Sequence, residues 1–192
     1  MAVDRAQLTA SLHSFYDFGG KVVLCVGGGH GQLLDPKILT AETVLIDRDE
    51  KSLTETHAKH GRVRAIVADF KDVNAQGDVV YFEFCLHEMG EPREGIEHAK
   101  ELAPDVVIFE HSPGSEWVFY AAEEDGVCRS AQALAQFPIK RRQNVHVEQI
   151  FKDYAELVAK LAAQGDLAVQ RAAHFADVTN IVIPMKCDLV LL

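Results

Sequence analysis

Short apolar runs alternate with amphipathic stretches along the first half of the chain. Five of the runs have the length of a strand: Lys21–Val26, Thr43–Ile46, Val63–Val67, Asp78–Phe82 and Asp105–Phe109. Because polar and apolar residues do not alternate inside these runs, both faces of each strand are expected to be covered. The stretches between them include helices predicted at Gly31–Leu39, Asp49–His60 and Arg93–Leu102. The pattern predicts an α/β fold with a parallel, doubly wound sheet and helices on both faces.

The second half of the chain has a different pattern. Apolar spacing predicts short helices at Glu116–Asp125 and Ser130–Gln136, and the longest helix at Glu148–Ala163. The last 25 or so residues are predicted as two strands around a turn near Asp177–Asn180. Pro184 cannot donate a hydrogen bond to a neighbouring strand, which favours an edge position or a bulge.

Composition limits the classes of partner. The chain has 19 Lys and Arg against 29 Asp and Glu, a formal charge of −10, and such a surface repels nucleic acid. No apolar stretch approaches the roughly 18 residues that span a bilayer, and the N-terminal residues lack the apolar run of a signal peptide. Four cysteines without CxxC spacing are typical of reduced thiols, mostly in the core. We therefore expect a cytoplasmic protein that binds neither nucleic acid nor membrane.

A glycine cluster follows the first strand directly. Gly27, Gly29 and Gly31 form a G-x-G-x-G pattern, and such a turn lets the backbone approach a ligand closely. The dinucleotide fingerprint would need its third glycine at Gln32, and no Lys-Ser/Thr pair completes a P-loop. By itself, the cluster is also consistent with a tight turn that binds nothing.

Acidic residues follow the next two strands. Asp47 ends the second strand and can accept two hydrogen bonds from a ribose diol. Asp69 and Phe70 follow the third, where a carboxylate beside a ring can hold an adenine. Either aspartate alone is also consistent with a helix N-cap or turn residue. The carboxyl ends of parallel strands meet at one crevice, however, so these features are expected to lie together.

In their order, these motifs resemble those of class I S-adenosylmethionine-dependent methyltransferases, over residues 20–110. The matching segments are VVLCVGGGHGQ, VLIDRDE, AIVADF and GDVVYFEFCLHEM. The C-terminal part is similar to that family's last two strands. The resemblance implies a Rossmann-like sheet of about seven strands, mostly parallel with an antiparallel last strand. It also implies one domain over residues 1–192, with a helical N-terminal cap at residues 1–20 and an acceptor-side insertion at 111–147.

The resemblance implies S-adenosylmethionine as cofactor and assigns its binding residues. The glycine loop would hold the methionine part, Asp47 the ribose, and Asp69 with Phe70 the adenine; Cys25 and Glu83 border the same site. The family usually carries Asp or Glu where this chain has Cys25. That departure motivates one alternative, a non-catalytic methyltransferase-like binding protein. An NAD(P)-dependent oxidoreductase is the other.

The acceptor side is expected after the fourth and fifth strands. His87 is a candidate general base, because an ordinary pKa of about 6.5 leaves it neutral at cellular pH; a structural His-Glu pair is the alternative. We expect Glu88, His111, Trp117 and Tyr120 to contact substrate, although the aromatic residues also fit simple packing of their own helix. The carboxylates and histidines here do not have a recognised metal-ligand spacing, so no metal is expected.

The resemblance implies a methyltransferase that acts on a small-molecule acceptor by displacement at the sulfonium methyl group. A long apolar run at the C-terminus, Ile181–Leu192, either completes the sheet or forms the interface of a homodimer.

Overall fold

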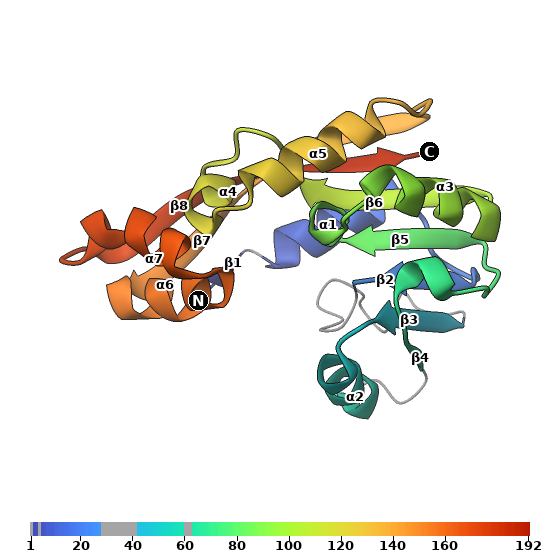
Figure 1. Ribbon diagram of the computed structural model, residues 1–192, viewed down its shortest axis with the longest axis horizontal. Coiled ribbons are helices and arrows are strands. Elements are labelled where there is room, and N and C mark those ends of the chain that lie inside the picture. The colour runs from blue at the N-terminus through green and yellow to red at the C-terminus, as the bar shows by residue number, and fades with distance from the viewer. Residues whose placement is uncertain (1, 4, 28–41, 60–62) are drawn as a thin grey trace.

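The computed structural model describes residues 2–3, 5–27, 42–59 and 63–192, which form one sheet flanked by helices (Figure 1). The sheet order is β1-β7-β8-β6-β5-β2-β3-β4. Its strands are β1 (Ala2–Val3), β2 (Val23–Val26), β3 (Thr43–Asp47), β4 (Arg64–Val67), β5 (Val79–Glu83), β6 (Asp105–His111), β7 (Arg141–Asp153) and β8 (Thr179–Leu191).

Helices connect most of these strands. They are α1 (Arg5–Phe15), α2 (Glu50–Lys59), α3 (Pro92–Leu102), α4 (Glu116–Ala121), α5 (Glu124–Leu134), α6 (Tyr154–Leu161) and α7 (Asp166–Arg171). Short 3-10 turns lie at η1 (Phe70–Asp72), η2 (Leu86–Glu88), η3 (Ala162–Gln164) and η4 (Ala173–Phe175). The helix predicted at Gly31–Leu39 lies outside the described residues.

The five predicted parallel strands are confirmed. β2 pairs in parallel with β3 on one side and with β5 on the other, and β4 and β6 extend the sheet outward. The chain therefore winds in one direction through β2, β3 and β4, and in the other through β5 and β6. In open α/β sheets, ligands bind at such a reversal, outside the carboxyl ends of the strands.

The last strand is antiparallel, as predicted. β8 lies between β6 and β7 and runs antiparallel to both. Pro184 pairs with Glu148 of β7, and it lies beyond Cys187–Leu191, the stretch of β8 that β6 pairs. The predicted edge character of Pro184 is thus local. At Pro184, β8 is no longer paired with β6, so the missing N–H of proline costs no hydrogen bond between these strands.

Buried side chains form a core on each face of the sheet. One core joins alternate residues of the central strands to Leu8, Leu12 and Phe15 of α1 and to residues from α4, α6 and α7. The other joins the intervening strand residues to α3 and to Leu134 of α5. This confirms the doubly wound arrangement. β4 is the exception to full coverage, because it is an edge strand and Val67 is half exposed.

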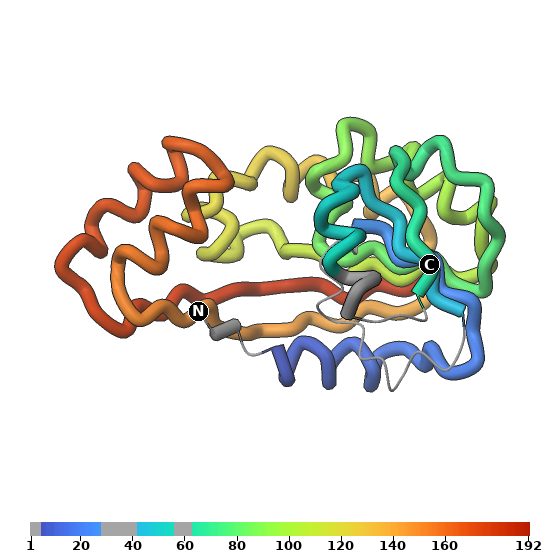
Figure 2. Tube along the Cα trace, turned by 90° about the horizontal axis from the view of Figure 1, so that it is seen from below, coloured from blue at the N-terminus to red at the C-terminus, as the bar shows by residue number. Residues whose placement is uncertain are grey.

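The N-terminal helix packs on a face of the sheet, and Figure 2 shows it running beside β7. The apolar residues Leu8, Leu12 and Phe15 of this helix are buried, as is Tyr16 directly after it.

Two predictions for the second half are wrong. Residues 148–153, expected to begin the longest helix, continue β7, and α6 starts only at Tyr154. The residues before the final strand, expected to form its partner, instead form α7 and η4, and the partner is β7. β7 and β8 run together well beyond the other strands, to the end where α6 and α7 lie (Figure 1). The predicted insertion at 111–147 thus ends inside the sheet, because β7 begins at Arg141.

None of the helices in the described ranges is both long enough and apolar enough to cross a bilayer.

A close contact at the end of β2 requires a glycine. Gly27 has φ +72°, and a Cβ added to it would lie 2.3 Å from Cβ and 2.6 Å from Sγ of Cys85. Gly20 has the same φ, but nothing lies within 4 Å of its added Cβ. We expect Gly20→Ala to lower the free energy of unfolding by about 1 kcal/mol through backbone strain alone.

We expect Gly27→Ala to cost roughly 2 kcal/mol more than that, because overpacking adds to the strain. Urea unfolding of both variants and the wild type measures the difference. Equal losses in the two variants would contradict the close contact.

Candidate functional site

A cavity of about 790 Å³ opens at the carboxyl edge of the sheet. The ends of β2, β3, β4, β5 and β6 all contribute to it, and residues of α1, α6, β7 and β8 complete its wall. The volume lies in the upper part of the range of roughly 300–1,000 Å³ that is typical of small-molecule sites. We call the part lined by Asp47, Asp49 and Asp69 the aspartate end, and the part lined by His87, His111 and Glu123 the histidine end.

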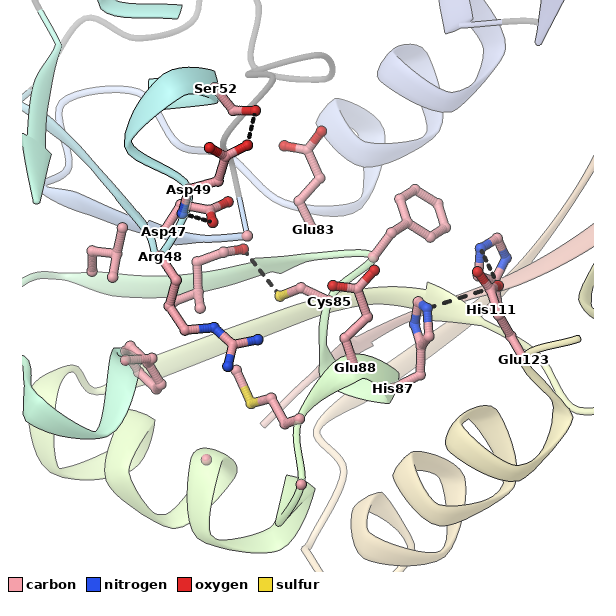
Figure 3. Close-up of a pocket in the computed structure, with 18 of the residues that line it drawn as sticks. Asp47, Arg48, Asp49, Ser52, Glu83, Cys85, His87, Glu88, His111 and Glu123 are labelled. Carbon is pink, nitrogen blue, oxygen red and sulfur yellow. Dashed lines mark hydrogen bonds and ion pairs between the residues drawn. The ribbon is translucent and has the colours of Figure 1, made fainter. Parts of the chain in front are cut away.

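The aspartate end follows β3 and β4. Asp47 is the last residue of β3, and one of its oxygens accepts the backbone N–H of Asp49 at 3.0 Å. Asp49 in turn accepts the N–H of Lys51 in the first turn of α2. Arg48, between the two aspartates, also lines the cavity (Figure 3).

Asp69 and Phe70 each have a structural contact as well as a place on the cavity wall. Asp69 is the N-cap of η1 and accepts the N–H of Lys71, so the N-cap alternative expected from sequence is confirmed. Phe70 is buried, with its ring edge-on to Phe82 at 5.4 Å. This packing fixes the ring at the wall.

Cys25 and Glu83 face each other beneath the cavity, from the neighbouring strands β2 and β5. Cys25 is fully buried and does not line the cavity, whereas Glu83 does. The thiol sulfur lies 4.0 Å from Oε2 of Glu83. Burial, together with the charge of Glu83, raises the pKa of Cys25 well above its usual value, so the thiol is neutral. The carboxylate at this level of the sheet therefore stands on β5 and not on β2.

The histidine end is organised by a buried ion pair. Nδ1 of His87 lies 2.7 Å from Oε1 of Glu110, and the backbone N–H of His87 donates to Oε2 at 3.0 Å. Glu110, in β6, also accepts the N–H of His111 at 2.7 Å. Burial alone would lower the pKa of His87, but the hydrogen bond and charge of Glu110 outweigh it and raise the pKa to about 9. His87 therefore keeps its proton at neutral pH, and the reasoning that made it a general base does not hold.

His111 and Glu123 complete this end of the cavity. Burial lowers the pKa of His111 to about 4, so this ring is neutral. Burial raises the pKa of Glu123 and outweighs the charge of His87, which lowers it; the nearby Glu88 and Glu110 raise it further. Oε2 of Glu123 lies 3.8 Å from Nε2 of His87 and 4.0 Å from Nε2 of His111, as the dashed lines of Figure 3 indicate.

The cavity wall is acidic. Among the described residues that line it, eight carboxylates face four Lys or Arg side chains. Such a wall attracts cationic ligands and disfavours ligands with several negative charges.

Most predicted site residues meet at this cavity. Glu88, His111 and Trp117 line it, together with Gly27, Asp47, Asp69, Phe70, Glu83 and His87. Tyr120 is not among its lining residues, and its hydroxyl lies 3.2 Å from Nε2 of His174. Gly29 and Gly31 fall outside the described residues.

Sequence reasoning missed several lining residues, among them Glu123, Gln149 and Lys160. Of these three, only Gln149 could have been recognised from the sequence, because it is a polar residue between Val147 and Phe151 in a row of alternating apolar residues. Within the described ranges, no group of three or more His, Cys, Asp or Glu has the arrangement of a metal site.

Neither a protein-family model nor a curated protein matches the chain by sequence. Solved structures do match. A protein from Bacillus halodurans C-125, provisionally assigned as a methyltransferase, is 13% identical with a TM-score of 0.68 over 98% of this chain and 97% of its own. Magnesium protoporphyrin IX methyltransferase from Synechocystis PCC 6803, solved with bound SAH, is 15% identical with a TM-score of 0.57 over 97% and 80%. A cyclase is 16% identical with a TM-score of 0.61 over 95% and 80%.

At these identities the likeness establishes the fold. The chain has the Rossmann-like fold of the class I methyltransferases, including the antiparallel last strand.

The His87–Glu110 pair makes stability depend on pH. The pKa of His87 rises from 6.5 to about 9 on folding. The pair therefore stabilises the fold fully below about pH 6.5 and loses this contribution as the pH rises towards 9. We expect the free energy of unfolding to fall by about 1.5 kcal/mol between about pH 6.5 and 8. Urea unfolding at a series of pH values measures this.

Glu110→Gln is the control, since it removes the charge that raises the pKa of His87. Its stability should stay nearly constant over the same window. The window ends at pH 8 because the buried thiols, whose pKa values are raised in the fold, begin to ionise in the unfolded chain above it. The same slope in variant and wild type would contradict the pairing.

Proposed function

We propose that the protein binds S-adenosylmethionine in this cavity and transfers the methyl group to a small-molecule acceptor. The observation that carries the proposal is the convergence of Asp47, Asp69 and Glu83 on one cavity, from the ends of three different strands. Each is an acceptor-only group when ionised, so the set calls for a ligand with several separate donors.

S-adenosylmethionine has donors that fit this set. Asp47 would accept from the ribose diol, and Asp69 from the adenine amino group beside the ring of Phe70. Glu83 would accept from the ammonium group of the methionine part. When bound, the cofactor supplies a methyl group on a positively charged sulfur, which is electrophilic without further activation.

The charge of the wall favours this cofactor over a dinucleotide. Carboxylates outnumber basic side chains two to one among the described lining residues, and NAD(P) would bring a pyrophosphate into that field. The sulfonium and ammonium groups of S-adenosylmethionine are attracted by the same field. This weighs against the oxidoreductase alternative.

The enclosed histidine end supports a small acceptor. The side chains of His87 and His111 are less than a tenth exposed, and Glu88 and Trp117 stand beside them on the wall. Groups this deep favour a small acceptor over a bulky polymer. Protonated His87 would then donate a hydrogen bond to the acceptor and orient it, so that alignment with the methyl group does most of the work.

The structural neighbours support the cofactor assignment, because one of them was solved with bound SAH. The cyclase among them shows that the fold also carries other chemistry. The proposal of methyl transfer therefore depends on the residues of this cavity.

Isothermal titration with S-adenosylhomocysteine tests the proposal. We expect micromolar affinity, about −8 kcal/mol. Asp47→Asn and Asp69→Asn should each weaken binding by roughly tenfold, because each removes a charge-assisted hydrogen bond. Asp72→Asn, a matched change in η1 at an exposed residue outside the cavity wall, should leave the affinity unchanged.

NADH serves as the comparison ligand. Tighter binding of NADH than of S-adenosylhomocysteine would overturn the proposal in favour of an oxidoreductase. Absence of S-adenosylhomocysteine binding at millimolar concentration would favour a protein that keeps the fold for another purpose.

A second experiment tests the role of Glu83. Cys25→Asp would place a buried carboxylate within about 4 Å of Glu83, so we expect it to lower both stability and affinity through like-charge repulsion. Glu83→Gln alone should weaken S-adenosylhomocysteine binding, since the charge that faces the ammonium group is lost.

The double variant Cys25→Asp/Glu83→Gln moves the carboxylate from β5 to β2, and it should bind better than either single variant. A double-mutant cycle measures this coupling. Additive losses would contradict the idea that one carboxylate serves this position.

A further inference from the structure

Buried polar atoms without partners gather around the histidine end of the cavity. Nδ1 of His111, Oε2 of Glu123 and Oε1 of Gln149 have no hydrogen-bond partner among the described residues, and all three residues line the cavity. Gln149 is only 5% exposed, and it occupies an inward position of β7 where its neighbours are apolar. An unsatisfied buried polar group costs roughly 1–3 kcal/mol, so three at one cavity indicate atoms that a ligand satisfies.

Local structure directs Glu123 into this space. Ala122 adopts the left-handed conformation, φ 59°, and turns the chain between α4 and α5. α5 then lies directly on η2, since a Cβ added to Gly126 would come within 2.6 Å of the carbonyl oxygen of His87. Glu123, one residue before α5, is thereby fixed opposite the ring of His87.

The distances leave room for a ligand atom. Oε2 of Glu123 is 3.8 Å from His87 and 4.0 Å from His111, which is beyond hydrogen-bond range. Glu110, in contrast, already accepts three hydrogen bonds from the chain and is not among the residues that line the cavity. Glu110 is therefore a positioning residue for His87, and Glu123 is the carboxylate available to a substrate.

The side chains of the surrounding wall indicate the shape and polarity of that substrate. Phe84 and Trp117 contribute rings and Met185 a flexible apolar side chain. Phe84 holds a left-handed conformation, φ 48°, with its ring centroid 4.9 Å from that of His111. Backbone strain of this kind is characteristic of functional sites. Rings and a thioether suit a flat apolar body, while Glu88 and Glu123 disfavour an anionic one.

We propose that Glu123 accepts the proton of a neutral, flat acceptor that carries a hydroxyl group, and that it is the general base of the transfer. This inference rests on the proposed function. The acceptor oxygen forms a bond to the methyl carbon as the carbon–sulfur bond breaks, and the electron pair of that bond goes to sulfur. The hydroxyl proton goes to the Glu123 carboxylate and from there to solvent. Protonated His87 donates to the same oxygen and orients one of its lone pairs.

Fluorine NMR with two probes tests the binding part directly. 4-Fluorophenol carries the hydroxyl donor, and 4-fluoroanisole has a similar flat body without it. Both are titrated into the wild type and the variants, with and without S-adenosylhomocysteine. We expect the wild type to bind 4-fluorophenol at least about tenfold more tightly, the lower end of the value of one hydrogen bond to a charged group.

Variants at adjacent residues separate the carboxylate from the fold. Glu123→Leu should reduce the preference for 4-fluorophenol to less than about twofold, and Glu123→Gln should give an intermediate value, because its neutral oxygen still accepts. Glu124→Leu is the matched control, since Glu124 pairs with Arg171 and is not among the cavity-lining residues. It should keep the full preference. The Glu123 variants should still bind S-adenosylhomocysteine, and Glu124→Leu should bind it with unchanged affinity.

An equal preference in the wild type and Glu123→Leu would overturn the inference. Failure of the wild type to bind 4-fluorophenol at about 10 mM, an ordinary limit for fragments, would do the same. If the wild type still binds S-adenosylhomocysteine, neither result contradicts the proposed function. Failure of the wild type to bind S-adenosylhomocysteine would overturn the proposed function. The titration of the two fluorinated probes in the absence of S-adenosylhomocysteine would still decide the role of Glu123.

Discussion

The reversal of winding between β2 and β5 determines where ligands can bind. Because β2 pairs with β3 on one side and β5 on the other, the connections leave the sheet in opposite directions there. The contact of Gly27 with Cys85 keeps these two strand ends close together. Side chains that follow β3, β4, β5 and β6 then face one cavity (Figure 3), although they are far apart in the sequence.

Electrostatics divides the cavity into two functional ends. Neutral Cys25 of β2 leaves Glu83 of β5 as the carboxylate at this level of the sheet. At the other end, Glu110 holds His87 in its protonated form, and burial raises the pKa of Glu123. The chain thus presents carboxylates at one end, and at the other a protonated histidine opposite the carboxyl group of Glu123.

The first half of the fold could be predicted from sequence because its signals are local. Each central strand is apolar on both faces, and each site carboxylate either ends its strand or lies within two residues of the strand's end. β7 could not be predicted, since Ile150, Phe151 and Tyr154 also fit the face of a helix and Gln149 interrupts the alternating row. Pairing with β8, which is distant in sequence, decides the outcome. Glu123 was missed for the same reason, because only packing of α5 on η2 brings it to the cavity.

A crystal structure with S-adenosylhomocysteine tests the central claim most directly. The account predicts the adenine beside Asp69 and Phe70, the ribose hydroxyls on Asp47, and the ammonium group within hydrogen-bond distance of Glu83. The sulfur should point towards His87 and Glu123. A ligand bound at another face, or one whose ammonium group lies away from Glu83, would contradict it.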